Sequence, residues 1–450
     1  MNIVIVGGGK VGELLCTELS TTKNNVLLIE QNADVLEHLM EKADISGIVG
    51  NGASYPILME ADVAHCDVFI AVTEMDEINM ISAIMANKIG ADYTIARVRT
   101  PENYQSFSFV EDSLGIHMMI NPELEAAKKI FLELEFPFAL NVDTFANNLV
   151  SLVKVSIDVG SSLGGMDLPS FKKRYSSLIV CIIERNGEVF IPKGDSVLRE
   201  GDHIHVTGRP ADLEKFYSSL GAQHRRVKSC LIIGGGRITH YLLRMLAMTD
   251  MDVKVIEQDR QKARDLAVAF PKVAVIHTDG SEKSNLDEEG IHRYEAVVSL
   301  TGMDEENIVI SMYASKCCVQ KIITKINRTA IISYLGDIGL MSIITPKRLI
   351  ANRITRFVRA IENSMGSNVE ALYKLADDRV ESLQFRVKER SKVIGRPLRE
   401  LPIKKNMIIA YIIREGEALF PGGNDKIEAG DKVIVITIKD GLLDIDDILE

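Results

Sequence analysis

The chain has 450 residues, 46% of them hydrophobic and 26% charged, which is the balance of an ordinary soluble globular protein of about three domains. Its formal net charge is −11 and no block of Lys or Arg stands out, which argues against nucleic-acid binding, because sequence-independent binding needs a basic face that displaces phosphate counterions. No apolar run approaches the ~18 residues of a membrane span, so the sequence predicts no transmembrane helix.

The chain begins with an apolar run at residues 3–6, which predicts a buried β-strand and not a signal peptide, because no basic region precedes it. A glycine-rich turn and a helical segment follow. In such a unit the first glycine allows the tight turn, the second lets the backbone approach a pyrophosphate, and the third lets the helix pack near the strand. The helix N-terminus offers free N–H groups to the phosphates. We therefore predict nucleotide binding by Gly7, Gly8, Gly9, Lys10, Val11 and Gly12. A turn that serves only strand–helix packing is the alternative.

Glu30 directly follows the second apolar run, Val26 to Ile29, and lies about 20 positions after Gly9. A carboxylate at this place can accept both ribose hydroxyls of a nucleotide. It would repel a 2′-phosphate, and the next residues, Gln31 and Asn32, supply no cation to offset it. NAD(H) or an adenosine nucleotide is therefore favoured over NADP.

The rest of the first domain alternates between helical and strand patterns. We expect helices at 34–42, from 57 and at 76–90, and strands at 45–49, 68–73 and 94–98. This β-α-β-α-β order predicts a parallel sheet with helices on both faces, which binds ligands at the carboxyl ends of its strands. The polar residues expected there are Asn51, Thr73, Glu74 and Arg97. Arg97 could neutralise a phosphate; a surface cation at a strand end is the alternative, and Thr73 could simply end its strand.

The second half of the chain repeats the first. Gly234 lies 227 positions after Gly7, and Glu257 lies 227 positions after Glu30. Thr301 and Lys325 fall on Thr73 and Arg97 at an offset of 228, so the chain contains a duplication. The second site is predicted at Gly234, Gly235, Gly236, Arg237, Ile238, Glu257 and Lys325.

The second site departs from the first in two places. Thr239 replaces the third glycine and puts a β-branched side chain where the helix should approach the strand, and Gly302 replaces Glu74. Nucleotide binding and a structural domain without ligand both remain open for this copy.

The segments between the two nucleotide-binding units also pair, as in Glu200-Gly201-Asp202 and Ala429-Gly430-Asp431. They consist of short alternating strands with glycine turns, so each copy carries a small α+β module. The fold class is therefore α/β: two doubly wound Rossmann-like domains, each followed by a small α+β domain. The expected domains are 1–136, 137–224, 225–362 and 363–450.

No pattern of reactive side chains accompanies the binding units. The nine histidines form no motif, and H-E-x-x-H, G-x-S-x-G and the G-K-[ST] P-loop are missing. His203 and His205 alternate on a strand, where a metal pair is disfavoured. We predict no catalytic residue, no metal and no enzyme. An NAD-dependent oxidoreductase, which would need a proton donor, is the alternative, and a scaffold with vestigial sites is the third possibility.

A helical pattern at 346–363 carries Arg353, Arg356 and Arg359 at every third position. These cations could contact a partner or a membrane face, or they could simply form a solvated face.

Taken together, these motifs resemble the TrkA family, the peripheral regulatory subunits of Trk-type potassium uptake systems, whose domains are of the RCK (also called KTN) type. The resemblance covers essentially all 450 residues. It depends on the first glycine turn with Glu30, on GNG at 50–52, on T-E-M-D-E-I-N at 73–79, on ARV at 96–98 and on the duplication.

The resemblance implies a cytoplasmic protein, peripheral on the inner face of the plasma membrane, with small domains of the RCK-C type. It implies binding of NAD(H), or of ATP and ADP, and assembly of a homo-oligomer, a dimer or a tetramer ring, beneath an integral membrane potassium translocating subunit. The helix at Pro122 to Glu135 is a subunit-interface element by this likeness alone.

Overall fold

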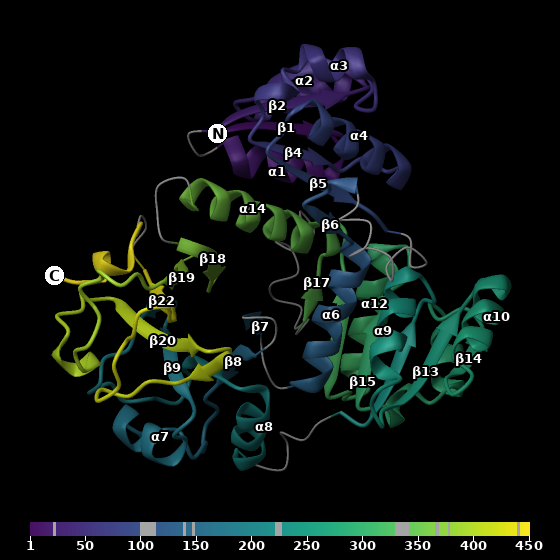
Figure 1. The fold of residues 1–450 in the computed structure, drawn as a ribbon. Coiled ribbons are helices and arrows are strands. Elements are labelled where there is room, and N and C mark those ends of the chain that lie inside the picture. The colour runs from purple at the N-terminus through teal and green to yellow at the C-terminus, as the bar shows by residue number, and fades with distance from the viewer. Residues whose placement is uncertain are drawn as a thin grey trace. The chain divides into compact units, whose positions relative to one another are not determined.

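The computed structural model describes the chain except for residues 21–23, 100–113, 138–140, 146–148, 221–226, 329–341, 365–368, 377–378 and 439–441. The described residues form two compact units (Figure 1). The first combines Met1–Phe131 with Lys228–Val358, and the second combines Leu132–Val227 with Arg359–Glu450. Each unit therefore contains one segment from each half of the duplicated chain. The domain boundary expected at 224/225 lies outside the described residues.

The first half of unit 1 has the predicted parallel sheet, in the order β3-β2-β1-β4-β5-β6. Its strands are β1 (Asn2–Val6), β2 (Asn25–Glu30), β3 (Ser46–Val49), β4 (Val68–Ala71), β5 (Tyr93–Arg97) and β6 (Met118–Ile120). Its helices are α1 (Lys10–Ser20), α2 (Ala33–Lys42), α3 (Tyr55–Glu60), the short η1 (Val63–His65) and α4 (Asp76–Ile89). The central strands are apolar on both faces because helices cover both, as buried parallel strands require.

The second half of unit 1 repeats this topology, in the order β14-β13-β12-β15-β16-β17. Its strands are β12 (Ser229–Ile233), β13 (Asp252–Glu257), β14 (Ala274–His277), β15 (Ala296–Ser299), β16 (Lys321–Lys325) and β17 (Ile343–Ile344). Its helices are α9 (Arg237–Leu246), α10 (Arg260–Ala269), α11 (Lys283–Glu288), η4 (Ile291–Arg293) and α12 (Asp304–Lys316). The duplication read from the sequence is therefore present in the fold.

Two further helices, α6 (Pro122–Glu135) and α14 (Pro346–Ser364), connect the two halves of unit 1 (Figure 1). Just before α6, Asn121 Nδ2 donates to Tyr241 Oη of α9 at 2.8 Å. Along α14, Thr355 Oγ1 donates to Glu18 of α1 at 2.8 Å. The first turns of α6, which belong to the first half, thus contact the second half. The body of α14, which belongs to the second half, contacts the first half.

The arginine series on α14 is partly engaged inside unit 1. Arg353 forms an ion pair with Glu125 of α6, and Arg356 Nε donates to the carbonyl of Asn352 at 3.1 Å. At least Arg353 therefore joins two elements of the fold and is not simply part of a solvated face.

Unit 2 contains two antiparallel five-stranded sheets, in the orders β10-β9-β11-β8-β7 and β18-β19-β22-β20-β21. The first has β7 (Asn141–Phe145), β8 (Val150–Ser156), β9 (Ile179–Arg185), β10 (Glu188–Phe190) and β11 (His203–Gly208), with α7 (Leu168–Arg174) and α8 (Pro210–Ser219). The second has β18 (Val369–Leu375), β19 (Val380–Arg386), β20 (Met407–Arg414), β21 (Glu417–Leu419) and β22 (Lys432–Thr437), with η5 (Leu398–Glu400) and η6 (Ile445–Ile448).

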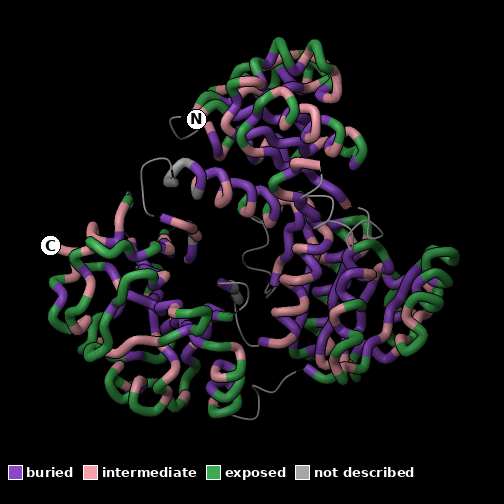
Figure 2. Tube along the Cα trace, in the orientation of Figure 1, coloured by how far each residue is buried: buried purple, intermediate pink, exposed green. Residues whose placement is uncertain are grey.

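The two sheets of unit 2 share a buried apolar core that includes Leu152 and Ile182 from one sheet and Tyr411 and Ile436 from the other. The central strands of both sheets are largely buried (Figure 2). The repeated Gly-Asp pairs of the sequence have a structural role here. Asp202 accepts two hydrogen bonds from Arg185, both at 2.7 Å, and Asp431 accepts the equivalent pair from Arg414. Each aspartate therefore forms an ion pair within its own small domain.

A buried charge cluster lies on the side of β9 and β11 that contains Glu184 and His205. His205 Nε2 lies 2.6 Å from the Glu184 carboxylate, and Lys154 Nζ lies 2.9 Å from it. Arg379, from the other small domain, lies 3.6 Å from it. His205 is therefore committed to Glu184. The hydrogen bond from His205 is the largest influence that lowers the pKa of Glu184, to about 2, against the opposing effect of burial.

This cluster predicts a specific acid sensitivity. Because the folded-state pKa of Glu184 lies below its ordinary value of 4.5, its contribution to stability is present above that value and is lost as pH falls toward 2. We expect the urea midpoint of Glu184→Gln to fall less than that of the parent chain between pH 5 and pH 3. Equal slopes for the two proteins would contradict this assignment.

Candidate functional site

The first glycine turn is held in shape by its own packing. Gly7 has φ +102°, a value that favours glycine, and a Cβ there would lie 3.0 Å from the backbone N of Thr73. A Cβ on Gly12 would lie only 1.9 Å from the carbonyl oxygen of Gly7, so a side chain at this position would push α1 away from the turn. Gly9, by contrast, has no atom within 4 Å of such a Cβ. The space beside Gly9 is therefore free of protein atoms, whereas the space beside Gly7 and Gly12 is filled by them.

An acidic side chain rests on the glycine turn in each copy. Glu30 accepts the N–H of Gly8 at 2.5 Å and the N–H of Asn32 at 2.9 Å. Glu257 accepts the N–H of Gly235 at 2.5 Å and the N–H of Asp259 at 2.7 Å. An ionised carboxylate has about four acceptor positions, so each keeps capacity for a hydroxyl donor. The structure thus brings Glu30 and the glycine turn together.

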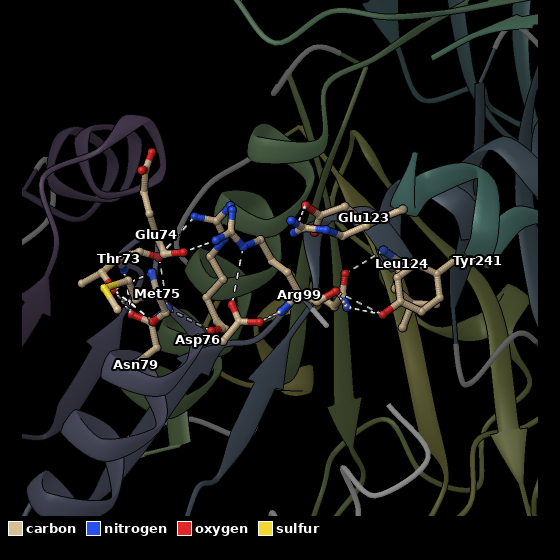
Figure 3. A network of polar contacts seen from close by, with 12 residues as sticks. Thr73, Glu74, Met75, Asp76, Asn79, Arg99, Glu123, Leu124 and Tyr241 are labelled. Carbon is tan, nitrogen blue, oxygen red and sulfur yellow. Dashed lines mark hydrogen bonds and ion pairs between the residues drawn. The ribbon is translucent and has the colours of Figure 1, made fainter. Parts of the chain in front are cut away.

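The ends of β4 and β5 are joined by one buried amide, that of Asn79 on α4 (Figure 3). Its Oδ1 accepts the N–H and the hydroxyl of Thr73, each at 2.7 Å. Its Nδ2 donates to the carbonyls of Thr73 and Arg97, at 3.1 and 2.9 Å. Because Thr73 is held by Asn79, β4 ends at Ala71, two residues before the predicted end. Asn79 therefore positions both Thr73 and Arg97.

Asp76 completes this network by accepting the N–H of Arg99 at 2.8 Å. The second copy repeats it: Asn307 accepts the N–H of Thr301 at 2.8 Å and donates to the carbonyl of Lys325 at 3.1 Å. The repeated T-x-M-D-E-x-N motif therefore forms a hydrogen-bond network that joins two strand ends to a helix. We call this network the clasp. Sequence reasoning did not assign Asn79 or Asp76 to the site, although their repetition at an offset of 228 was the signal.

Three of the predicted ligand residues are engaged locally in this structure. Asn51 Oδ1 accepts the N–H of Ala53 at 2.9 Å and stabilises its own turn. The Thr73 hydroxyl bonds to Asn79. Glu74 contributes its backbone carbonyl, which accepts from Arg99, while its exposed side chain points away from the network (Figure 3).

The second glycine turn has the same backbone form as the first, with Gly234 at φ +104°. Thr239, in place of the third glycine, is fully buried and its hydroxyl donates to the carbonyl of Gly234. Helix α9 still begins at Arg237, as α1 begins at Lys10. The β-branched side chain therefore fits against the turn, and its polar atom is satisfied there.

A cavity of about 210 Å³ opens on this second turn, within unit 1. Residues from both halves line it: Arg97, Pro122, Glu123, Gly236, Arg237, Ile238, Thr239, Leu300, Lys325, Asn327, Pro346 and Lys347. The structure thus brings together five predicted residues, Arg97, Gly236, Arg237, Ile238 and Lys325. The sequence favoured the first turn as the clearer site, whereas the first-turn residues Gly7 to Gly12 are not part of this cavity's lining.

Sequence reasoning missed Glu123, Lys347 and Asn327. Glu123 and Lys347 follow the prolines that begin α6 and α14, so they occupy equivalent places in the repeat. Nothing in their spacing places them near the second glycine turn. Only the packing of these two helices shows it.

The charges around the cavity are mostly positive. Burial lowers the pKa of Arg97, and the nearby charge of Arg99 lowers it further. Burial likewise lowers the pKa of Lys325. Among the described residues, Arg97 Nε has no hydrogen-bond partner, and neither has Glu123 Oε2.

Three helices begin at this cavity: α6, α9 and α14. Helix N-termini carry partial positive charge and free N–H groups. Desolvated cations at the same place are stabilised by a bound anion. The arrangement therefore suits the phosphates of a nucleotide.

Comparison with known families identifies both kinds of domain. Residues 3–122 and 230–346 match the TrkA-N domain, and residues 152–221 and 383–450 match the TrkA-C domain. The "Trk system potassium uptake protein TrkA homolog" of Archaeoglobus fulgidus is 30% identical over 449 residues, 100% of each chain. The "Trk system potassium uptake protein TrkA" of Halomonas elongata is 30% identical over 445 residues, 97% of this chain and 96% of that one.

Solved structures share the fold. The GsuK RCK domain has a TM-score of 0.63 at 16% identity and covers 97% of this chain and 92% of its own. The GsuK channel bound to NAD has a TM-score of 0.65 at 16% identity and covers 97% of this chain and 76% of its own. Within the described part of the present chain, no helix has the length and apolar character needed to span a membrane.

Proposed function

The chain belongs to the TrkA family, whose TrkA-N and TrkA-C domains it contains twice, and on that premise we propose that it is a nucleotide-binding regulatory subunit of a potassium uptake system. In this proposal it lies in the cytoplasm on the inner face of the plasma membrane. It forms a dimer or tetramer ring and gates an integral membrane potassium translocating subunit. Its ligand is NAD(H), with ATP or ADP as alternatives, and it catalyses no reaction.

The observation that carries this proposal is the cavity at the second glycine turn. Its walls come from both halves of unit 1, and it combines Arg97 of one half with Lys325 and Arg237 of the other. An anion seated there would contact both halves at once. Nucleotide binding can therefore favour one arrangement of the two halves over another.

A ligand shifts such an equilibrium only by its differential affinity for the two arrangements. Moving the population from 1:99 to 99:1 takes roughly 5.5 kcal/mol. In a ring, each chain would contribute two glycine turns. Several modest binding events would then together supply that free energy.

Binding is tested first with the purified full-length chain. NADH binding is followed by nucleotide fluorescence, and ATP and ADP binding by calorimetry. We expect saturable binding of at least one of these ligands. Binding of none of them would refute the proposal, and oxidation of NADH with a carbonyl substrate would favour an oxidoreductase instead.

Gating is tested in vesicles that contain the integral membrane potassium translocating subunit of a Trk-type system. Uptake of rubidium is measured with and without the chain, and with and without nucleotide. We expect uptake to depend on the chain and to change when nucleotide is added. Uptake that is indifferent to both would refute the gating role even if nucleotide binds.

A further inference from the structure

Two neighbouring cysteines, Cys317 and Cys318, directly follow the last residue of α12. The N–H of Cys317 donates to the carbonyl of Tyr313 at 3.0 Å, and the N–H of Val319 donates to the carbonyl of Ala314 at 3.2 Å. Cys318 has φ +58°, in the left-handed region that favours glycine. The thiol pair therefore belongs to the turn that ends the helix, and not to the helix itself.

Helix α4 of the first half ends with the same kind of turn, in which the N–H of Ala91 donates to the carbonyl of Ala86 at 3.0 Å. The residue with positive φ there is Gly90, at +136°, 228 positions before Cys318. Glycine adopts such a backbone without steric cost, whereas a residue with a Cβ does so rarely. The second half thus carries a thiol where the backbone by itself favours glycine.

The surroundings of the thiol pair also differ between the halves. The Tyr313 hydroxyl donates to Asp287 of α11, and the Lys283 ammonium lies 5.6 Å from the centre of the Tyr313 ring. The bond with Asp287 raises the pKa of Tyr313 most, and a hydrogen bond with the Cys317 thiol also raises it. At the offset of 228, the first half has neither a charge nor a thiol at these five positions, which hold Tyr55, Met59, Met85, Ile89 and Gly90.

The thiol pair is also the accessible part of the chain's cysteine content. All six cysteines lie in the described part of the chain and are free thiols, and four of them are buried: Cys16, Cys66, Cys181 and Cys230. Burial raises the pKa of each of these four, to about 12 for Cys16 and Cys66, so they stay protonated at neutral pH. Cys318 is exposed and Cys317 is half-buried. A dissolved oxidant therefore meets Cys318 first, with a second thiol on the adjacent residue.

We propose that Cys317 and Cys318 form a reversible thiol switch that responds to hydroperoxides. The Cys318 thiolate attacks the peroxide, so that an S–O bond forms, the O–O bond breaks and the leaving oxygen takes a proton as alcohol or water. Cys318 is then a sulfenic acid. The Cys317 thiol attacks this sulfur, the S–S bond forms, and the S–O bond breaks as water leaves with the Cys317 proton. Two thiols and one hydroperoxide thus become one disulfide, one alcohol (water from hydrogen peroxide) and one water.

A disulfide between neighbouring residues is easily reduced because it is strained. Adjacent Cα atoms lie about 3.8 Å apart, whereas disulfide-bonded residues usually have theirs about 4.4–6.8 Å apart. Strained and exposed disulfides have the more oxidising potentials, which makes them labile to thiol reductants. Cys317 also packs against the apolar core of the second half, beside Tyr313, so that forming the bond disturbs this packing. The dithiol is therefore the resting state and the disulfide a transient one.

The test uses the full-length chain, reduced, freed of reductant and then treated with hydrogen peroxide without nucleotide. Maleimide labelling after denaturation counts the remaining thiols, and proteolysis with mass spectrometry locates the new bond. We expect the chain to lose two of its six thiols, both from the pair, and to regain them with reduced glutathione. Non-reducing electrophoresis shows whether the bond lies within one chain.

Three variants assign the roles, and thermal unfolding checks that each is folded. Cys318→Gly restores the residue of the first half, so it should fold, and its thiols should oxidise at least about tenfold more slowly than those of the parent. Cys317→Ser should react at Cys318 as fast as the parent but stop at the sulfenic acid, which dimedone traps. Cys16→Ala is the matched control: it removes a buried thiol and should oxidise at the parent's rate.

Four results would overturn the inference. They are a bond between two copies of the chain, loss of buried thiols in place of the pair, an unchanged oxidation rate in Cys318→Gly, and a disulfide that reduced glutathione does not reverse. None of these measurements involves nucleotide, so the thiol switch and the proposed nucleotide-binding function stand or fall separately.

Discussion

Gly9→Val is expected to weaken nucleotide binding at the first turn by at least about 100-fold while leaving the melting temperature unchanged. The physical reason is that a Cβ at Gly9 meets nothing within 4 Å in the protein, so the valine fits the fold. The same side chain occupies the space through which a pyrophosphate must approach the backbone. Calorimetry with NADH or ATP, together with thermal unfolding, measures both effects.

Gly12→Val provides the contrast, because a Cβ there would lie 1.9 Å from the carbonyl oxygen of Gly7. We expect it to lower both affinity and stability, the latter by about 1–3 kcal/mol, as overpacked positions do. Thr239→Gly, at the equivalent place in the second copy, is the control and should leave the first turn unaffected. Unchanged affinity in Gly9→Val would show that the ligand does not use this turn.

Asn79→Ala is expected to destabilise the first half of unit 1 by about 3 kcal/mol. The side chain is fully buried and its amide makes four hydrogen bonds, to Thr73 and to the carbonyl of Arg97. Its removal leaves buried backbone groups without partners, each of which costs about 1–3 kcal/mol. Urea unfolding of the full-length chain measures the loss, and nucleotide affinity should fall with it because Arg97 is no longer held.

Asn307→Ala is the matched variant, because Asn307 makes three equivalent bonds: it accepts the N–H of Thr301 and donates to the carbonyls of Thr301 and Lys325. A similar loss there would show that both copies depend on the clasp. Asn79→Asp keeps the acceptor oxygen and loses the donor, so its stability should lie between those of Asn79→Ala and the parent. If Asn79→Ala unfolds at the same urea concentration as the parent, the clasp does not stabilise the fold.

The two glycine turns have matching backbones but different side chains around them. Thr239, which marks the second turn as atypical in the sequence, is accommodated by a hydrogen bond to Gly234. A second difference is Glu123, which comes from the first half of unit 1 and lies 3.6 Å from Arg237 at the second turn.

Much of the fold followed from the sequence because its determinants are local. Apolar runs such as residues 3–6 and 68–73 predicted buried parallel strands, the second of which ends at Ala71 in the structure, and the glycine spacing predicted the turn between β1 and α1. The offset of 227 to 228 residues was enough to predict that the second half repeats the first. Glu30 was likewise expected beside the turn, because β1 and β2 are successive parallel strands whose carboxyl ends lie at the same edge of the sheet.

The tertiary structure alone decided how the halves combine. Helix α6 of the first half packs its first turns against the second half, and α14 of the second half packs against the first half. The cavity therefore gathers Arg97, Glu123 and Lys347 around Arg237 and Lys325. The clasp by Asn79 and the pairing of Glu184 with His205 and Arg379 also appear only once distant segments pack. Periodicity and spacing report the environment of a residue along its own element, whereas contacts between elements depend on packing that no local pattern encodes.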